Sequence, residues 1–335
     1  MHGLLISLLN VCSIAMHCAA AQAPSPSHVT VYYEAGRYGG WPANHGIRRW
    51  GNENDGGQTW TVESRRTLTP AQKGGPAAQQ LSKPLDFLAP DFAMQFRFGD
   101  NNRGPSWFYY SEDRCRTWKG PFKLPDFGRR GVSARTDYQV IGKSTCLIFA
   151  SAAKANGGEG RPFCARTADG GLTWEFVSWI GPEPKGYAIM PSTVRLSPET
   201  LLTAIRRKEE GHTWIEAYRS PNNGVEWQYL GHIVPSTWRG SNPPSLIRLR
   251  DGRLCVTYGY RGVPFGIRAQ ISQDDGKTWE EEIMLRQDGT ATDLGYTRSV
   301  QRPDGKIVTV YYFNAPAHRE RTIEATVWDP GRAKP

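Results

Sequence analysis

Residues 272–279 read Ser272-Gln-Asp-Asp-Gly-Lys-Thr-Trp279, and this pattern recurs with small departures at 53–60, 111–118, 167–174 and 220–227. The pattern combines a hydroxyl, an Asp or Asn, a glycine and a tryptophan, but the copy at 111–118 has Cys115 in place of the glycine and the copy at 53–60 lacks the opening hydroxyl. In a tight turn, an Asp or Asn side chain bonds the turn's own backbone, a glycine adopts positive φ, and a tryptophan packs on the sheet beneath. Five copies in the same register therefore indicate a repeated β-hairpin.

The spacing of the repeats predicts the architecture. Successive tryptophans of the pattern, from Trp60 to Trp279, lie 52 to 58 residues apart, which suits one four-stranded propeller blade per repeat. We expect innermost strands at 192–196, 245–249 and 299–302, and second strands at 254–258 and 307–312. A strand at 322–328 completes a sixth blade with residues 28–34, so both termini share one blade. The predicted fold is an all-β, six-bladed β-propeller.

The first blade departs from this pattern. His45 and Trp60 are separated by 15 residues, whereas Ser192 and Trp227 are separated by 35. The difference corresponds to about two strands with their turns. We therefore predict a shortened first blade, which could leave an exposed sheet edge or provide a dimer contact in a chain that otherwise acts as a monomer.

Composition limits the classes of protein that fit. The chain has 335 residues, of which 39% are hydrophobic and 22% charged, so it is neither disordered nor fibrous. An apolar run at 4–16, followed by three alanines ending at Ala21, is typical of a cleaved signal peptide. After residue 22 no window has the ~20 apolar residues of a membrane helix. We predict a signal peptide over 1–21, a single propeller domain over 22–335, and a secreted or periplasmic protein.

The four cysteines beyond the predicted signal peptide match no zinc-binding spacing. Cys146 and Cys164 either pair across neighbouring strands or remain buried thiols. No cofactor and no metal site are predicted. The net charge of +9 is compatible with acidic partners, but an exported propeller with this repeat is not expected to bind nucleic acid.

Residues near the start of each innermost strand and the end of each second strand should surround one end of the central channel. This position is rich in arginine. Several guanidinium groups that face one pocket suit a carboxylate or sulfate, because each offers a forked pair of donors. The candidate ligand-binding residues at this end are Asn44, Arg97, Arg135, Arg206, Arg261 and Arg298, and the neighbouring candidates are His45, Asp86, Asp137, Lys154, Met190, Arg207, Asn242 and Tyr296.

The repeated turns resemble the Asp boxes of the sialidase-like β-propellers, and the resemblance covers nearly the whole chain after residue 22. It implies a terminal acidic sugar held by three arginines and attacked by a tyrosine that a glutamate assists. The segment Gly295-Tyr-Thr-Arg-Ser299 resembles the tyrosine-containing segment of those enzymes. Tyr296 is then the nucleophile and Glu216 its partner. The resemblance assigns the carboxylate-binding positions to Arg37, Arg206, and either Arg261 or Arg268.

Two features depart from the sialidase pattern. Arg37 lies in Gly-Arg-Tyr-Gly-Gly and not in the Arg-Ile-Pro motif. The acid/base aspartate should come from the shortened first blade, where Asp55 belongs to the repeated turn.

The segment 36–46, which contains Trp41 and ends in Asn44-His45-Gly46, resembles the N-terminal block of propeller enzymes that cleave rhamnose from glucuronic acid. In that family a histidine is central, so His45 would be the general acid or base. Trp41 would be either a sugar-stacking platform or a core residue. An arginine (Arg97, Arg135 or Arg206) would neutralise the uronate carboxylate, and Tyr296 or Tyr138 would protonate the leaving oxygen.

Three functions follow, in order of preference. The first is a secreted, sialidase-like exo-glycosidase that acts on a terminal acidic sugar in an arginine-lined axial pocket. The second is a His45-dependent hydrolase or lyase that cleaves rhamnose-capped glucuronate glycans. The third is an inactive propeller that binds an acidic glycan or oligosaccharide.

Overall fold

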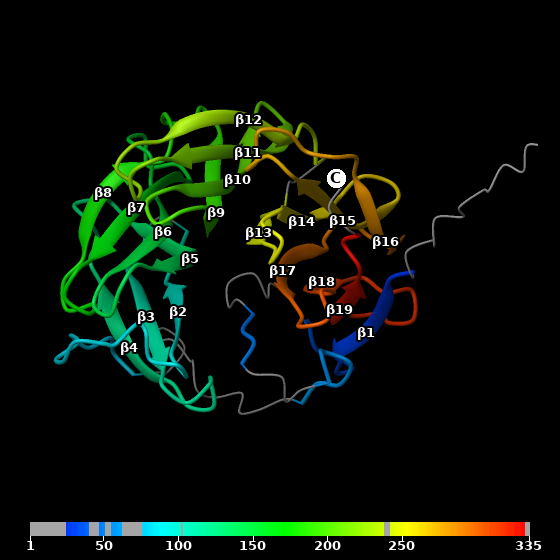
Figure 1. The fold of residues 1–335 in the computed structure, drawn as a ribbon, viewed down its shortest axis with the longest axis horizontal. Helices are drawn as coiled ribbons and strands as arrows, with labels where there is room; N and C mark the ends of the chain where they lie inside the picture. Colours follow the sequence, from blue (N-terminus) through cyan, green and yellow to red (C-terminus); the bar gives the residue numbers. More distant parts are fainter. Residues whose placement is uncertain are drawn as a thin grey trace, which may run out of the picture.

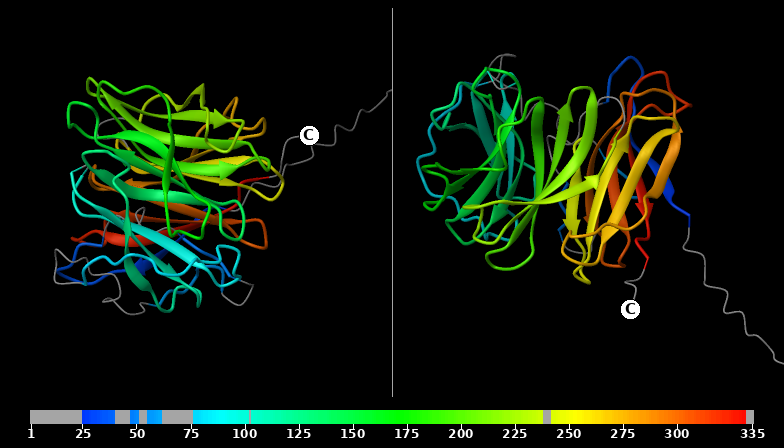
Figure 2. Two further views of the ribbon diagram at one scale, coloured as in Figure 1. Left: turned by 90° about the vertical axis from the view of Figure 1, so that its left-hand side faces the viewer. Right: turned by 90° about the horizontal axis from the view of Figure 1, so that it is seen from above.

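The computed structural model describes residues 25–39, 47–50, 55–61, 76–101, 103–237 and 242–331. These residues form five antiparallel sheets arranged in a ring (Figure 1). Figure 2 shows the strands running roughly along the axis of this ring. The strands are β1 (Ser27–Tyr32), β2 (Ala93–Phe98), β3 (Ser106–Ser111), β4 (Lys119–Leu124), β5 (Val132–Val140), β6 (Cys146–Ala152), β7 (Arg161–Thr167), β8 (Glu175–Trp179), β9 (Tyr187–Arg195), β10 (Leu201–Glu209), β11 (His212–Ser220), β12 (Gln228–Val234), β13 (Ser245–Arg248), β14 (Leu254–Tyr260), β15 (Phe265–Ser272), β16 (Ile283–Gly289), β17 (Gly295–Gln301), β18 (Ile307–Phe313) and β19 (Thr322–Trp328).

The architecture confirms an all-β propeller and corrects the number of blades. Three sheets contain four consecutive strands each, β5 to β8, β9 to β12 and β13 to β16. A fourth has the order β1-β19-β18-β17, and the fifth contains only β2, β3 and β4. The prediction of six blades is therefore wrong, because the described residues form five.

The predicted closing strand is confirmed. β1 pairs antiparallel with β19, with Ser27 opposite Val327 and Val29 opposite Ala325. The first and last strands thus share one sheet, which ties the two ends of the described chain together. The innermost strands β9, β13 and β17 also lie where the sequence predicts them.

The core lies between neighbouring sheets. Every residue of β6 is buried, because both faces of its sheet pack against neighbours. The tryptophans of the repeated turns add to this packing: Trp174 contacts Phe108 of the preceding sheet with ring centroids 6.1 Å apart, and Trp227 contacts Phe149 at 6.3 Å. These two turns therefore help to join neighbouring sheets.

Four of the repeated turns connect the last two strands of a sheet, which are β3 and β4, β7 and β8, β11 and β12, and β15 and β16. In the turn at 167–174, Asp169 Oδ1 accepts hydrogen bonds from the Thr167 hydroxyl at 2.8 Å and from the Thr173 backbone N–H at 3.0 Å. The Gly171 N–H donates to the Thr167 hydroxyl oxygen at 2.8 Å. These bonds account for the residue types that the pattern repeats.

The position of these turns shows which strand the first sheet lacks. The turn at 111–118 follows β3 as the turn at 167–174 follows β7. β2 and β3 therefore correspond to the second and third strands of a complete sheet. The innermost strand is missing among the described residues, and Asp86 precedes a turn and no strand.

The turn that contains Asp55 belongs to none of the five described sheets. A Cβ on Gly57 would lie 3.2 Å from Val308 Cγ1, so this turn packs on the sheet of β17 to β19. No described strand accompanies it, and Figure 1 shows that the sheets of β2 and β17 do not stand side by side as the other neighbours do. The prediction of a shortened first blade becomes, in the structure, a turn without a described sheet.

Cys146 and Cys164 lie on neighbouring strands, and both are buried free thiols. Burial raises the pKa of each thiol above its usual value. In the part of the chain that the structure describes, no helix could cross a lipid bilayer.

Candidate functional site

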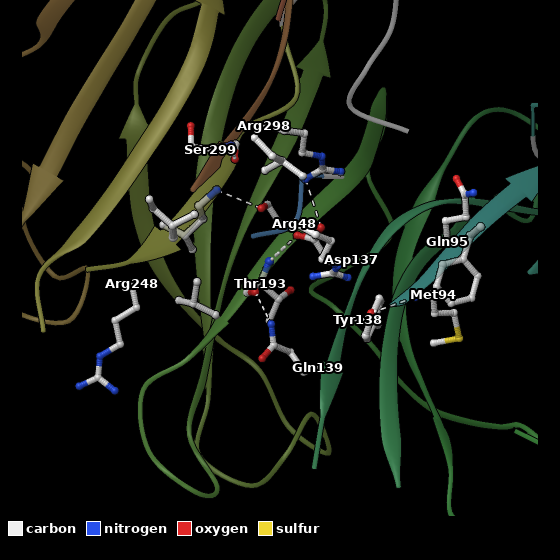
Figure 3. A pocket seen from close by; sticks show the side chains of 17 residues that line it. Arg48, Met94, Gln95, Asp137, Tyr138, Gln139, Thr193, Arg248, Arg298 and Ser299 are labelled. Atoms are coloured by element: carbon white, nitrogen blue, oxygen red, sulfur yellow. Dashed lines mark hydrogen bonds and ion pairs between the residues drawn. The ribbon is translucent and has the colours of Figure 1, made fainter. Parts of the chain in front are cut away.

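The central channel contains a cavity of about 260 Å³ between the innermost strands (Figure 3). An ion pair crosses it, since Arg298 of β17 donates from Nη1 to Asp137 Oδ1 of β5 at 3.1 Å. Asp137 Oδ2 also accepts from the Thr193 N–H at 3.1 Å. The Arg48 guanidinium lies over the ring of Tyr138, 4.7 Å from its centroid. The channel is thus polar and charged, and opposite charges meet across it.

The innermost strands are held together by side chains at one shared position. Ser192 Oγ accepts from the Leu246 N–H at 3.0 Å, and Ser245 Oγ accepts from the Ser299 N–H at 3.0 Å. Asp137 makes the corresponding bond to the next strand. Because each bond links one sheet to its neighbour, this position stabilises the wall of the channel.

At the mouth of the channel, Arg206 of β10 meets Tyr296 of β17. Arg206 Nη1 lies 3.2 Å from the Tyr296 hydroxyl, and Nη2 lies 3.2 Å from the hydroxyl of Tyr187. Arg206 is 8% exposed, and its guanidinium also contacts Met190 Sδ at 3.8 Å. Although burial opposes the charge, Tyr296 and Tyr187 raise the pKa of Arg206, so the guanidinium stays cationic.

The backbone at Tyr296 is unusual. Tyr296 has φ +53° and Met190 has φ +56°, values that non-glycine residues rarely adopt. Tyr296 lies at the register shift between Gly295 and Arg298 of β17, and Met190 lies at the corresponding register shift of β9. Such bulges redirect a side chain, and strained residues of this kind cluster at functional sites. Here the bulge coincides with the contact between Tyr296 and Arg206.

Asp293 organises a second part of the mouth. Its Oδ1 accepts from the Tyr312 hydroxyl at 2.6 Å and its Oδ2 from the Tyr38 hydroxyl at 3.2 Å. Arg261 donates to the Tyr312 hydroxyl oxygen at 2.9 Å and lies 3.4 Å from Asp293. Burial and the hydrogen bond to Asp293 raise the pKa of Tyr312, so its phenol is a neutral donor. Tyr312 also contacts the ring of Tyr296, with centroids 5.5 Å apart.

Arg135 forms the third part. Its Nη2 donates to Asn101 Oδ1 at 3.1 Å and forms a close ion pair with Glu159. The neighbouring Gly160 C=O accepts from the Ala188 N–H of β9 at 3.0 Å, next to Tyr187, which places Glu159 and Arg135 beside the same mouth. The predicted residues Tyr296, Arg135, Arg206 and Arg261 are therefore gathered at one end of the channel, and Arg298 lies within it.

Glu216 lies elsewhere. Its Oε2 accepts from Trp214 Nε1 at 2.8 Å, and Oε1 lies 3.4 Å from Arg207 Nε. Because side chains alternate along a strand, Arg207 and Arg206 point to opposite faces of the sheet. The structure therefore does not bring Glu216 to Tyr296.

The other predicted arginines do not join the cluster at the mouth. Arg268 is 2% exposed and pairs with Glu282 at 3.0 Å inside its sheet. Arg37 is exposed and lies 3.4 Å from Glu34. Arg97 is half-buried near the end of β2, and the loss of solvent around its guanidinium lowers its pKa to about 10. Three further predicted residues lie outside the described residues: Trp41, Asn44 and His45.

Sequence reasoning missed Glu159, Asp293, Tyr187 and Tyr312. Asp293 lies three residues before Tyr296, and Tyr312 closes a second strand, so position along the repeat could have indicated both. Glu159 lies in a loop with no repeated pattern, which left no signal. Among the described residues, no group of His, Cys, Asp or Glu side chains is arranged to hold a metal ion.

The BNR repeat-like domain model matches residues 98–310, which is more than half of the chain. The chain therefore belongs to the BNR repeat-like family, and the predicted kinship with the sialidase-like BNR propellers is confirmed at this level. No curated protein matches the chain.

Solved structures share the fold. A protein of unknown function from Dyadobacter fermentans has a TM-score of 0.60 and 22% identity, over 73% of this chain and 75% of that one. An endo-arabinase from Bacteroides thetaiotaomicron has a TM-score of 0.49 and 17% identity, over 76% and 96%. NanB in complex with optactamide has a TM-score of 0.48 and 16% identity, over 68% and 36%. At these identities the similarity concerns the fold alone. The likeness of segment 36–46 to rhamnose-cleaving enzymes stays a prediction.

Proposed function

We propose that this protein is a carbohydrate-active enzyme, an exo-acting glycoside hydrolase that holds a terminal acidic sugar at the mouth of its channel. The observation that carries the proposal is the 3.2 Å contact between the guanidinium of Arg206 and the hydroxyl of Tyr296, which come from two different sheets. A buried guanidinium suits a carboxylate, and the partly exposed ring of Tyr187 offers a flat wall for a sugar. The five repeated turns would then be Asp boxes.

In this proposal Tyr296 is the nucleophile and Arg206 holds its oxygen toward the sugar. A carboxylate of the mouth takes the phenolic proton as the tyrosine oxygen bonds to the anomeric carbon. The departing oxygen takes a proton from an acid of the same cluster, for which Asp293 and Glu159 are the candidates. A water molecule then attacks the anomeric carbon and gives its proton to the group that protonated the departing oxygen. The bond between the sugar and Tyr296 breaks, and the tyrosine oxygen takes back the proton that the first carboxylate held.

One observation favours a glycan-binding protein without activity as the second candidate. Among the described residues, the Tyr296 hydroxyl bonds with Arg206 and with no carboxylate. Arg135, Arg261 and Arg298 each pair with an acid at the site. A binding protein needs the pocket but not a base for Tyr296. For either function we also propose export through the segment 1–21 and action as a monomer.

The test is product analysis by mass spectrometry after incubation with sialylated glycans and with rhamnose-capped, glucuronate-containing glycans. We expect a free terminal acidic sugar, and we expect Tyr296→Phe to lower turnover by roughly 10²–10⁴-fold because the attacking oxygen is lost. Tyr229→Phe is the matched control, since this exposed tyrosine lies on the outer strand β12. Turnover in this control should match the parent protein.

Other products would contradict the proposal. Release of rhamnose, lost in His45→Gln and kept in Tyr296→Phe, would establish the His45-dependent enzyme. Acidic glycans that bind without any product would establish the binding protein.

A further inference from the structure

A second group of cationic side chains lies beside Arg135, at the same end of the strands. The loops that precede β3, β5 and β7 enclose a cavity of about 460 Å³. Its lining residues are Arg103, Arg130, Ala153, Asn156 and Gly157. The cavity is open to solvent, because Arg103, Arg130 and Asn156 are all exposed.

The two arginines of this cavity differ from those of the channel. Arg135 and Arg298 pair with carboxylates, whereas neither Arg103 nor Arg130 has a carboxylate within ion-pair distance among the described residues. Arg130 Nη1 lies 3.0 Å from the position that a Cβ of Gly157 would take, and Gly157 has φ +80°. A glycine at this position therefore lets the Arg130 guanidinium lie against the backbone and face the cavity.

A neighbouring contact adds positive charge to this surface. The guanidinium groups of Arg129 and Arg161 both lie over the ring of Trp179, 4.7 and 4.2 Å from its centroid. Burial and repulsion by Arg129 lower the pKa of Arg161, while Glu183 acts in the opposite direction. The ring attracts both cations, and Glu183, 3.4 Å from Arg161, offsets one of the two positive charges.

Two loops connect this cavity to the mouth of the channel. Asn101 and Arg103 belong to the loop before β3, and Asn156 and Glu159 belong to the loop before β7. Arg135 bonds both Asn101 and Glu159. A glycan chain whose terminal sugar occupies the mouth would therefore pass this cavity as it leaves the channel.

We propose that the cavity between Arg103 and Arg130 is a second subsite, which binds a sulfate ester or carboxylate on a sugar unit away from the terminal one. The substrate class is then a polyanionic glycan, and a single acidic sugar at the chain end is not sufficient for full affinity. The identity of the ligand as a glycan rests on the proposed function. A concave site next to the channel suits a chain in this position better than a flat membrane surface.

The test is isothermal titration calorimetry with two probes, a heparin-derived octasaccharide, which carries sulfates and carboxylates, and an octagalacturonate, which carries carboxylates alone. We expect at least one probe to bind to the parent protein. The double variant Arg103→Gln/Arg130→Gln should raise the Kd for that probe by roughly tenfold or more, because two charge-assisted donors are lost. Binding of the octasaccharide alone would identify the group as a sulfate ester.

The matched control is Arg116→Gln/Lys277→Gln, which removes the same charge from exposed residues of the turns at the opposite ends of the strands. This pair should keep the parent Kd. An equal loss of affinity in the two double variants would overturn the subsite. An unchanged Kd in Arg103→Gln/Arg130→Gln would also overturn it. Binding to phosphatidylglycerol vesicles that requires Arg103 and Arg130, without oligosaccharide binding, would also overturn it. Calorimetry does not depend on turnover, so an inactive mouth would leave this result readable.

Discussion

The turns at Asp169 and Asp55 are built alike but lie in very different surroundings. Asp55 Oδ1 accepts from the backbone N–H groups of Gly57 and Gln58 at 3.0 Å each, as Asp169 accepts from its own turn. The Asp169 turn joins two strands of a four-stranded sheet. The Asp55 turn joins no described strand.

One residue accounts for part of this difference. In the complete sheet, the Gly171 N–H donates to the hydroxyl of Thr167. Position 53 is a glutamate, so the Gly57 N–H turns to the Asp55 carboxylate instead. Trp174 packs on the preceding sheet, whereas Trp60 is 37% exposed. The comparison shows that the turn forms from local chemistry, while a blade also needs strands on both sides and a neighbour to cover it.

The two sides of the ring also differ in what they contribute to the proposed site. The complete sheets supply Arg206 and Tyr296, which meet because both sheets present the same ends of their strands to the channel. We therefore place the chemistry on the complete side. The following predictions test whether the two sides differ as the structure indicates, beginning with the largest expected effect.

Removal of the turn tryptophan should be far more costly on the complete side. Trp174→Ala should lower the free energy of unfolding by about 3 kcal/mol, because a ring packed between two sheets is lost. Trp60→Ala should lower it by about 1 kcal/mol or less, since the ring is partly in solvent. Urea denaturation followed by circular dichroism measures both values. Equal losses would show that the Asp55 turn is part of a complete blade.

Removal of the turn aspartate should also cost more free energy of unfolding on the complete side, although both losses should be smaller than those for the tryptophans. Asp169→Ala should lower the free energy of unfolding by about 1 kcal/mol, because its bonds to Thr167 and Thr173 are lost. Asp55→Ala should have a smaller effect, since its turn can open without separating two described strands. Urea denaturation measures both losses. A larger loss of unfolding free energy in Asp55→Ala than in Asp169→Ala would contradict the expected order.

Part of the pH dependence of stability should come from the turns within sheets. Hydrogen bonds from Thr117 and Ser111 lower the pKa of Asp113 to about 2. A carboxyl group whose pKa is lower in the folded state stabilises the fold above its unfolded pKa of about 4, and this contribution disappears as the pH falls toward 2. Between pH 5 and pH 2, the urea midpoint of the parent protein should therefore fall more than that of Asp113→Asn. Parallel curves for the two proteins would contradict the assignment.

Much of the fold could be predicted from the sequence because each repeated turn carries its own chemistry. The predicted strand at 322–328 is β19, and residues 28–34 contain most of β1. The number of blades could not be predicted in the same way. The Asp55 turn has nearly the full pattern, but the pattern reports a turn and not the strands that flank it.

The site could be predicted only where position in the repeat determines it. Arg206 and Tyr296 meet because each lies at the channel end of its strand. The alternation of side chains places Glu216 on the face of Arg207, and the sequence contains that information because 206 and 207 are adjacent. Asp293 and Glu159 depend on loop conformations, for which neither spacing nor composition gives a rule.

The most direct test of the proposed site compares two adjacent arginines of β10. Arg206 faces Tyr296, and Arg207 faces Glu216 on the other side of the sheet. The measurement is kcat/KM of Arg206→Lys and Arg207→Lys on the acidic glycan whose cleavage we propose, with circular dichroism as a check on folding. We expect Arg206→Lys to lower kcat/KM by about a hundredfold, because a lysine cannot replace the forked donor. Arg207→Lys should stay within about twofold of the parent. A large loss in Arg207→Lys with none in Arg206→Lys would move the chemistry to the face of Glu216 and contradict the account.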